Sequence, residues 1–280
     1  MDNPVEKSIT NVDRTVVSGQ QEVSDAPDPV KRSDSDKERS YTLGDFFTIK
    51  RGVETGGNDF FILTPMEVFG YDLPEEFLRP ILPGPSALAE QEIVADSRGD
   101  PILDNKRFLL NSPLQEWEIK QDYPSLWRYL EMGMERCVHE RYSCRHRNPW
   151  YSQERRPPAP YLCAYMGKSN KGDDAPFRFI LNHSKAIAQN VYLMMYPRPA
   201  LARRLRDDYS LRVTLWGTLN DMGNDEVLHR SRIYGDASGK LEPMELASVP
   251  ADRIVALMPD LVPDSVAQMN LFGQQPDQEI

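Results

Sequence analysis

Arginines gather around a short aromatic segment in the middle of the chain. The segment is Pro149, Trp150 and Tyr151, and its basic neighbours are Arg141, Arg145, Arg147, Arg155 and Arg156. A guanidinium group presents forked N–H donors that match phosphate oxygens and base edges, while aromatic rings stack on bases. The composition predicts a nucleic-acid contact. The arginines are the better candidates for this contact, because a tryptophan such as Trp150 more often packs in a core.

A second polar loop, from Arg51 to Asn58, also offers donors to a ligand. Its glycines allow a partner to approach the backbone closely, and Arg51, Thr55 and Asn58 carry side chains suited to phosphates or base edges. A purely structural interpretation has equal weight, since the same glycines would serve the turn of a hairpin between two strands. The sequence leaves both interpretations open.

Cysteines and histidines occur close together in the basic region, but their spacing argues against a zinc site. The set comprises Cys137 and His139, Cys144 and His146, and further on Cys163 and His183. Zinc ligands within a pair are usually about two to four residues apart, and these pairs are closer. We therefore expect no bound metal. The odd number of cysteines favours reduced thiols in a cytoplasmic protein.

Three other residues indicate an alternative chemistry, that of a metal-dependent nuclease. Asp104 and Glu118 would hold magnesium, and Lys120 would help to activate a water molecule. Glu118 and Lys120 fall on an expected helix, however, where charged side chains are ordinary surface. The nuclease stays as an enzymatic alternative, beside a protein-binding module whose basic face is incidental.

The charge of the chain is distributed unevenly. The net charge is −10, yet residues 131–212 hold 15 lysines and arginines, Lys168 among them, against 8 aspartates and glutamates. A basic stretch inside an acidic protein predicts a local surface for phosphates. No apolar run approaches the roughly 20 residues that a membrane helix needs, so a membrane span is not expected.

These residues need a scaffold, which the sequence predicts in three parts. Residues 1–40 are polar and predict a disordered tail or linker, residues 41–257 a folded domain, and residues 258–280 a flexible extension. Apolar runs predict strands within Tyr41–Ile49, Phe60–Leu63, Tyr161–Tyr165, Phe177–Leu181 and Ile187–Tyr196. Helix signals occur at Pro65–Gly70, after Ser112, around Leu126 up to Gly133, after Pro199 and over Leu211–Leu219. The pattern predicts an α+β fold, a twisted mixed β-sheet with flanking helices.

Four segments in order along the chain carry a resemblance to a known family. They are Arg51–Phe61, Arg147–Glu154, Phe179–Asn182, and Tyr234-Gly235 followed by Lys240–Leu246. Together they resemble the C-terminal target recognition region, the TaqI-like specificity domain, of adenine-specific DNA methyltransferases from restriction-modification systems. The resemblance covers about Tyr41 to Leu257. The turn Gly235–Gly239 departs from the family, which usually has consecutive glycines before the residue matching Lys240.

The resemblance implies a defence role in which this chain recognises duplex DNA and a methyltransferase catalytic domain methylates adenine. That catalytic domain binds S-adenosylmethionine through a glycine-containing turn and holds the flipped adenine in an Asn/Asp-Pro-Pro-Tyr/Phe loop. Neither motif is present here. No glycine cluster follows a buried strand and opens a helix in the manner of a cofactor site, and Asn148-Pro149-Trp150-Tyr151 lacks the second proline. We therefore expect no cofactor and no catalytic residue in this chain, and S-adenosylmethionine in a catalytic partner.

Overall fold

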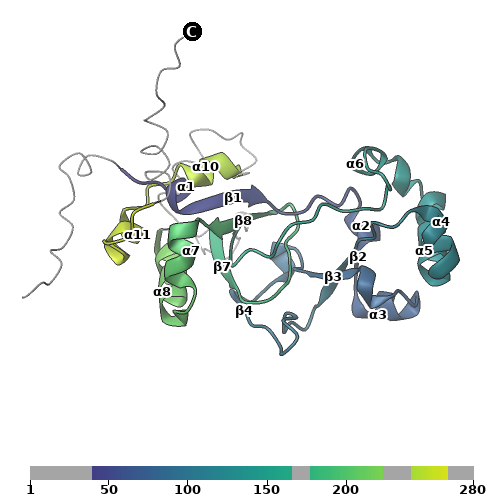
Figure 1. The fold of residues 1–280 in the computed structure, drawn as a ribbon, viewed down its shortest axis with the longest axis horizontal. Coiled ribbons are helices and arrows are strands. Elements are labelled where there is room, and N and C mark those ends of the chain that lie inside the picture. The colour runs from purple at the N-terminus through teal and green to yellow at the C-terminus, as the bar shows by residue number, and fades with distance from the viewer. Residues whose placement is uncertain (1–39, 166–176, 223–240, 264–280) are drawn as a thin grey trace, which may run out of the picture. The chain divides into compact units, whose positions relative to one another are not determined.

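The computed structural model describes residues 40–165, 177–222 and 241–263 (Figure 1). The predicted tail and C-terminal extension fall mostly outside these residues, so both stay predictions. Two predicted site residues, Lys168 and Lys240, also lie outside the described residues, as do Tyr234 and Gly235 of the last motif.

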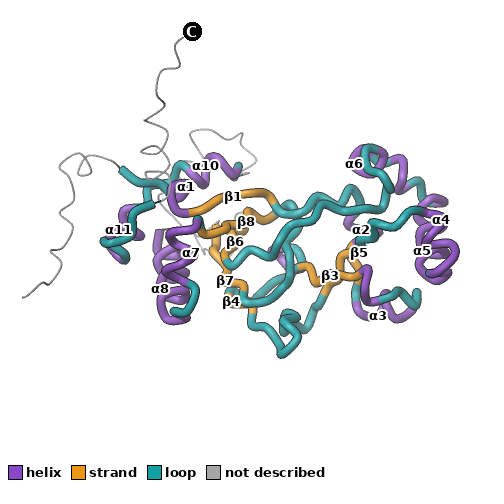
Figure 2. The backbone as a smooth tube through the Cα atoms, in the orientation of Figure 1, coloured by secondary structure: helices purple, strands orange, loops and turns teal. Residues whose placement is uncertain are grey.

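A mixed five-stranded sheet forms one part of the structure, and Figure 2 shows its strands in orange. In sheet order the strands are β1 (Phe47–Arg51), β8 (Tyr192–Pro197), β6 (Tyr161–Tyr165), β7 (Phe177–Asn182) and β4 (Glu92–Ile93). Neighbouring strands are antiparallel except β4, which runs parallel to β7. The predicted mixed sheet is confirmed, and its twist stays a prediction.

Both faces of this sheet are buried. Alternate residues of a strand point to opposite sides, and on β6 both sets lie in a core. On β6, Tyr161 and Cys163 join one core cluster, while Leu162 and Ala164 join another. The first cluster is closed by helices with the bounds α7 (Pro199–Leu205), α8 (Tyr209–Met222), α10 (Pro243–Ala247) and α11 (Asp252–Leu257). The second is closed by loop residues such as Leu82 and Leu103. No described helix is long and apolar enough to cross a membrane.

A smaller antiparallel sheet carries the region that holds the basic segment. Its strands, in order, are β2 (Ile62–Leu63), β5 (Arg107–Leu110) and β3 (Leu78–Ile81). The helices of this region are α2 (Asn58–Phe61), α3 (Pro65–Gly70), α4 (Glu116–Asp122), α5 (Pro124–Glu135) and α6 (Tyr142–Arg145). Single 3₁₀ turns occur at Glu75–Phe77, Pro85–Ala87 and Val138–Glu140, and α1 (Leu43–Phe46) precedes β1. A third core cluster, with Phe60, Phe61 and Tyr129 at its centre, holds the region together.

Several predicted elements are confirmed where a local signal defined them. Helix α3 begins at Pro65 because Thr64 and Glu67 form a capping box, with the Thr64 backbone N–H donating to Glu67 Oε2 at 2.7 Å. Strand β6 has the predicted bounds, and α7 begins at Pro199. The predicted strand over Ile187–Tyr196 is shorter, because β8 begins at Tyr192.

The hairpin interpretation of the first loop is wrong. Phe60 and Phe61 belong to the helical turn α2, and the strands on either side of the loop lie in different sheets. Strand β1 pairs with β8, and β2 pairs with β5. Apolar runs of this length do not distinguish a strand from a buried helical turn, which is why the pattern misled.

Candidate nucleic-acid interface

The first loop and the basic segment lie against each other although they are far apart in the chain. We call residues 51–58 and 141–156 together the paired loops. Arg147 joins them, because its Nη1 donates to the carbonyl oxygen of Thr55 at 2.7 Å and its Nη2 donates to that of Glu54 at 2.6 Å. The sequence suggested two separate ligand-binding segments, and the structure makes them one site.

A second arginine strengthens the same contact. The two terminal nitrogens of Arg141 donate to the two carboxylate oxygens of Asp59, at 2.5 and 2.9 Å. The hydrogen bond from Arg141 lowers the pKa of Asp59, and the same bond raises the pKa of Arg141. Because 69% of the Asp59 side chain is exposed, the pair contributes little to stability. Its main effect is to orient the guanidinium group and to neutralise its charge.

Gly56 is required by the close approach of the paired loops. Its φ of +78° is a left-handed conformation, and a Cβ atom there would lie 2.9 Å from Cys144 Sγ. Gly57 has an extended backbone with a φ of −177°, and a Cβ atom there would meet the flexible end of Arg141. We therefore expect valine at position 56 to damage folding more than valine at position 57.

The polar side chains of the first loop also bond within the protein. Thr55 is 1% exposed, and its hydroxyl donates to Asn58 Oδ1 at 2.5 Å and accepts from the Gly57 backbone. Asn58 is exposed and donates through Nδ2 to Gln189 Oε1 at 3.2 Å. Thr55 therefore shapes the loop and presents almost no surface, whereas Asn58 stays accessible to a ligand.

Arg51 and Arg156 lie at the other end of the paired loops. Arg156 donates through Nη1 to the Arg51 carbonyl oxygen and through Nη2 to Glu154 Oε2 at 2.9 Å. The Arg51 guanidinium forms an ion pair with Glu242, at the start of the segment that resembles the family's last motif. These two predicted DNA contacts are thus engaged with acidic partners in the described structure.

The aromatic pair anchors the basic segment in the core. Tyr151 is 1% exposed, its hydroxyl donates to the Leu114 carbonyl oxygen at 2.7 Å, and burial raises its pKa to about 12. Trp150 packs on Phe60 and Phe61, with ring centroids 5.9 and 6.0 Å apart. Tyr151 has no free surface on which a base would stack, so its predicted contact with DNA has no support in this geometry.

Two predicted arginines remain available to a ligand. Arg145 and Arg155 are exposed, and among the described residues neither guanidinium group forms a hydrogen bond or an ion pair. Arg145 lies over the ring of Tyr142, with its guanidinium carbon 5.2 Å from the ring centroid. Unpaired, exposed guanidinium groups next to loops held in a fixed shape are suited to phosphate contacts.

The alternative metal chemistries find no site in the described residues, where no group of three or more His, Cys, Asp or Glu side chains is placed to hold an ion. Glu118 instead caps α4, accepting from the Gln115 backbone at 2.7 Å. Lys120 lies 3.9 Å from Glu116 and over the Trp127 ring. Asp104 lies in an exposed turn. Glu118 and Lys120 thus have local partners of their own, and none of their described contacts involves Asp104.

The three thiols are expected to differ sharply in reactivity. Cys137 is exposed, whereas Cys144 and Cys163 are buried, and burial raises the pKa of both buried thiols, that of Cys163 to about 12. At pH 8 a pKa of about 12 leaves only about one thiol in ten thousand ionised. Titration with a chromogenic disulfide should show one fast thiol in the native protein and three in denaturant. Cys137→Ser should remove the fast reaction; two fast native thiols would contradict the described packing.

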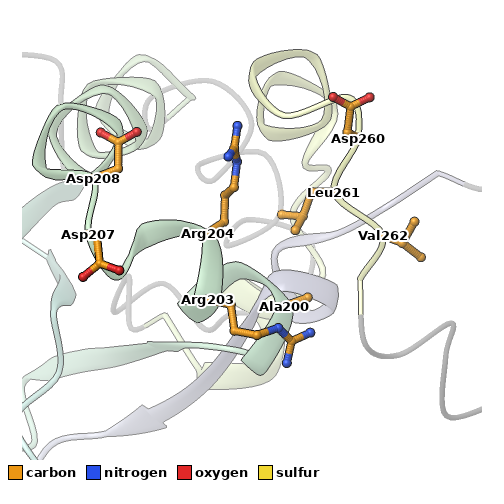
Figure 3. Close-up of a pocket in the computed structure, with 8 residues that line it drawn as sticks. All are labelled: Ala200, Arg203, Arg204, Asp207, Asp208, Asp260, Leu261 and Val262. Carbon is orange, nitrogen blue, oxygen red and sulfur yellow. The ribbon is translucent and has the colours of Figure 1, made fainter. Parts of the chain in front are cut away.

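A cavity beside α7 and α8 is a weaker candidate for a nucleic-acid contact. Figure 3 shows its lining, which mixes Arg203 and Arg204 with Asp207, Asp208 and Asp260. Carboxylates in this number offset the arginines and disfavour a polyanion. The paired loops are therefore the better candidate.

Comparisons with known proteins agree on a family. The family model described as "Type II methyltransferase M.Eco57I, C-terminal domain" matches residues 30–270. The chain is 24% identical over 199 residues to Type II methyltransferase M.AccI of Acinetobacter calcoaceticus, and 26% identical over 205 residues to M.XamI of Xanthomonas campestris pv. amaranthicola. These matches cover 71% and 73% of this chain and 34% of each relative, so the chain spans about a third of their length.

A solved structure gives a weaker likeness. It is that of the Type IIL restriction-modification enzyme MmeI in complex with DNA, with a TM-score of 0.34 and 14% identity over 86% of this chain and 34% of that one. A likeness at this level supports no inference about binding. The family model, by contrast, matches most of the chain, and on that ground the chain belongs to the family of Type II methyltransferase M.Eco57I C-terminal domains.

Proposed function

We propose that this chain recognises a duplex DNA sequence on behalf of a restriction-modification methyltransferase in the cytoplasm. The observation that carries the proposal is the pairing of residues 51–58 with residues 141–156. Arg147 joins the two loops, and Arg141 bonds to Asp59 directly after the first one. A fixed pair of loops presents donors without a large ordering cost on binding. Membership of a methyltransferase family supplies the context.

The catalytic step belongs, in this proposal, to a separate domain that binds S-adenosylmethionine and methylates adenine. Two features of the described residues support assigning that cofactor to another domain. The glycines before α2 open a helix of a single turn, which offers too few aligned N–H groups for such a site. The segment Asn148–Tyr151 offers little free surface to a flipped adenine, because Pro149 and Tyr151 are buried. The proposed role of this chain is therefore to bind and position DNA.

Salt dependence of duplex binding tests the proposal. Each phosphate contact lowers affinity by a slope of about 0.9 in a plot of log K against log salt concentration. The double variant Arg145→Ala with Arg155→Ala should flatten the slope by about 1 to 2 and leave stability nearly unchanged, because both side chains are exposed. Fluorescence anisotropy with a labelled duplex measures both affinity and slope.

The matched control is Arg253→Ala, which removes the same charge from an exposed position on α11. Its slope should equal that of the unchanged chain. An equal slope in the folded double variant would place the DNA surface elsewhere.

A further inference from the structure

A cavity of about 710 Å³ lies at the end of the basic segment, and Arg155 and Arg156 of that segment form part of its lining. Three arginines from two distant parts of the chain line it, namely Arg79 on β3 together with Arg155 and Arg156. The lining also includes Phe77, Leu114 and Tyr123. It thus combines cationic side chains with apolar and aromatic ones.

The arginines of this cavity outnumber the carboxylates in its lining. Arg156 is paired with Glu154 at 2.9 Å, which accounts for one charge. Arg79 donates only to a neutral group, the Arg156 carbonyl oxygen at 3.0 Å, and among the described residues neither Arg79 nor Arg155 has an ion pair. Two guanidinium groups in the lining therefore have no ion pair among the described residues.

The one carboxylate in the lining, Glu76, can offset the charge of only one of the two guanidinium groups. Glu76 accepts a hydrogen bond from the Tyr123 hydroxyl, which raises the pKa of that tyrosine. Arg79 is half-buried, and burial lowers its pKa, as does the charge of Arg155 to a lesser extent. The two guanidinium groups are therefore close enough to repel each other, and a bound anion would relieve that repulsion.

We propose that this cavity is a phosphate-binding site, with Arg79 and Arg155 as its charged donors. Two planar guanidinium forks offer more N–H groups than one carboxylate accepts, and they match the several oxygens of a phosphate group. The aromatic rings of Phe77 and Tyr123, whose centroids lie 4.7 Å apart in the same lining, would contact the sugar or base attached to the phosphate. The source of the phosphate, a DNA backbone, rests on the proposed function; the site itself does not.

Titration with inorganic pyrophosphate tests the site without DNA. Isothermal calorimetry at constant ionic strength should show saturable binding to the unchanged chain. Arg155→Ala should weaken it by about tenfold or more, because a charge-assisted hydrogen bond is lost. Arg79→Gln should have a similar effect, and the exposed control Arg253→Ala should have none. Should Arg79→Gln fail to fold, the exposed Arg155→Ala still decides. Binding that does not saturate, or that Arg155→Ala leaves unchanged, would overturn the proposal.

Competition then identifies the source of the phosphate. If a DNA phosphate occupies the cavity, pyrophosphate should displace a labelled duplex, and Arg155→Ala should weaken both ligands. If a free nucleotide is the ligand, Arg155→Ala should weaken pyrophosphate alone. A chain that binds pyrophosphate through these arginines but no duplex would contradict the proposed function and support the site. A chain that binds duplex but no pyrophosphate would contradict the site and support the proposed function.

Discussion

Gly52→Ala is expected to lower the free energy of unfolding by about 3 kcal/mol, because the added methyl group would collide with backbone atoms. A Cβ atom at position 52 would lie 2.0 Å from the carbonyl oxygen of Gln189 and 2.5 Å from that of Ala188. Neither oxygen can move aside on its own. The Gly52 N–H donates to the Tyr192 carbonyl oxygen at 2.9 Å, and the Val53 N–H donates to that of Ala188 at 2.8 Å. These bonds tie the first loop to residues 188–192.

A glycine in open space provides the matched control. Gly217 lies within α8, and no atom outside its own helix lies within 4 Å of the position that a Cβ would take. Gly217→Ala should therefore raise stability by about 0.5 to 1 kcal/mol, the helix propensity difference between the two residues. Urea unfolding followed by circular dichroism measures both changes. Equal midpoints for the two variants would show that the first loop does not approach Gln189 as described.

Arg147→Ala is expected to cost about 3 kcal/mol of stability, although arginine at the surface usually contributes little. Its guanidinium group donates to the carbonyl oxygens of Glu54 and Thr55 and also to Gln153 Oε1, at 3.1 Å. Removal would leave the carbonyl of the buried Thr55 with only a weak contact to the Cys144 thiol. The paired loops should then lose their fixed geometry, and duplex affinity should fall with them.

The variant Arg147→Lys separates this structural role from a role of charge. Lysine keeps the charge but lacks the fork that bridges two carbonyl groups, so most of the stability loss should persist. If Arg147 acted chiefly through its charge on DNA, Arg147→Lys would bind duplex like the unchanged chain. An unchanged urea midpoint in Arg147→Ala would contradict the role described here.

The parts of the fold that the sequence predicted are those with signals a few residues apart. The capping box of Thr64 and Glu67 defines the start of α3, and Pro199 defines the start of α7. The apolar run at Tyr161–Tyr165 was long enough to define β6. Pairing between distant segments has no such signal, so the separation of β1 and β2 into two sheets was not predictable.

The candidate site was predictable in its composition and not in its arrangement. The two polar segments were identified, but nothing local shows that Arg147 donates to the backbone of residues 54 and 55, or that Tyr151 is buried. Arg79 was missed because it lies outside the basic stretch of residues 131–212. On β3, Arg79 lies two residues before the buried Ile81, so both side chains point to the same side of the strand. This spacing is the sequence signal that places an arginine on an inward-facing side.

The central claim is that this chain reads a DNA sequence, and selection from a pool of random duplexes tests it most directly. The chain would be immobilised, the pool applied at near-physiological salt, and the retained duplexes amplified and sequenced over several rounds. The account predicts that one short sequence is enriched, and that a duplex carrying it binds more tightly than a scrambled one by about 1 to 3 kcal/mol for each base pair read. Retention without any enriched sequence, or no retention at all, would contradict it.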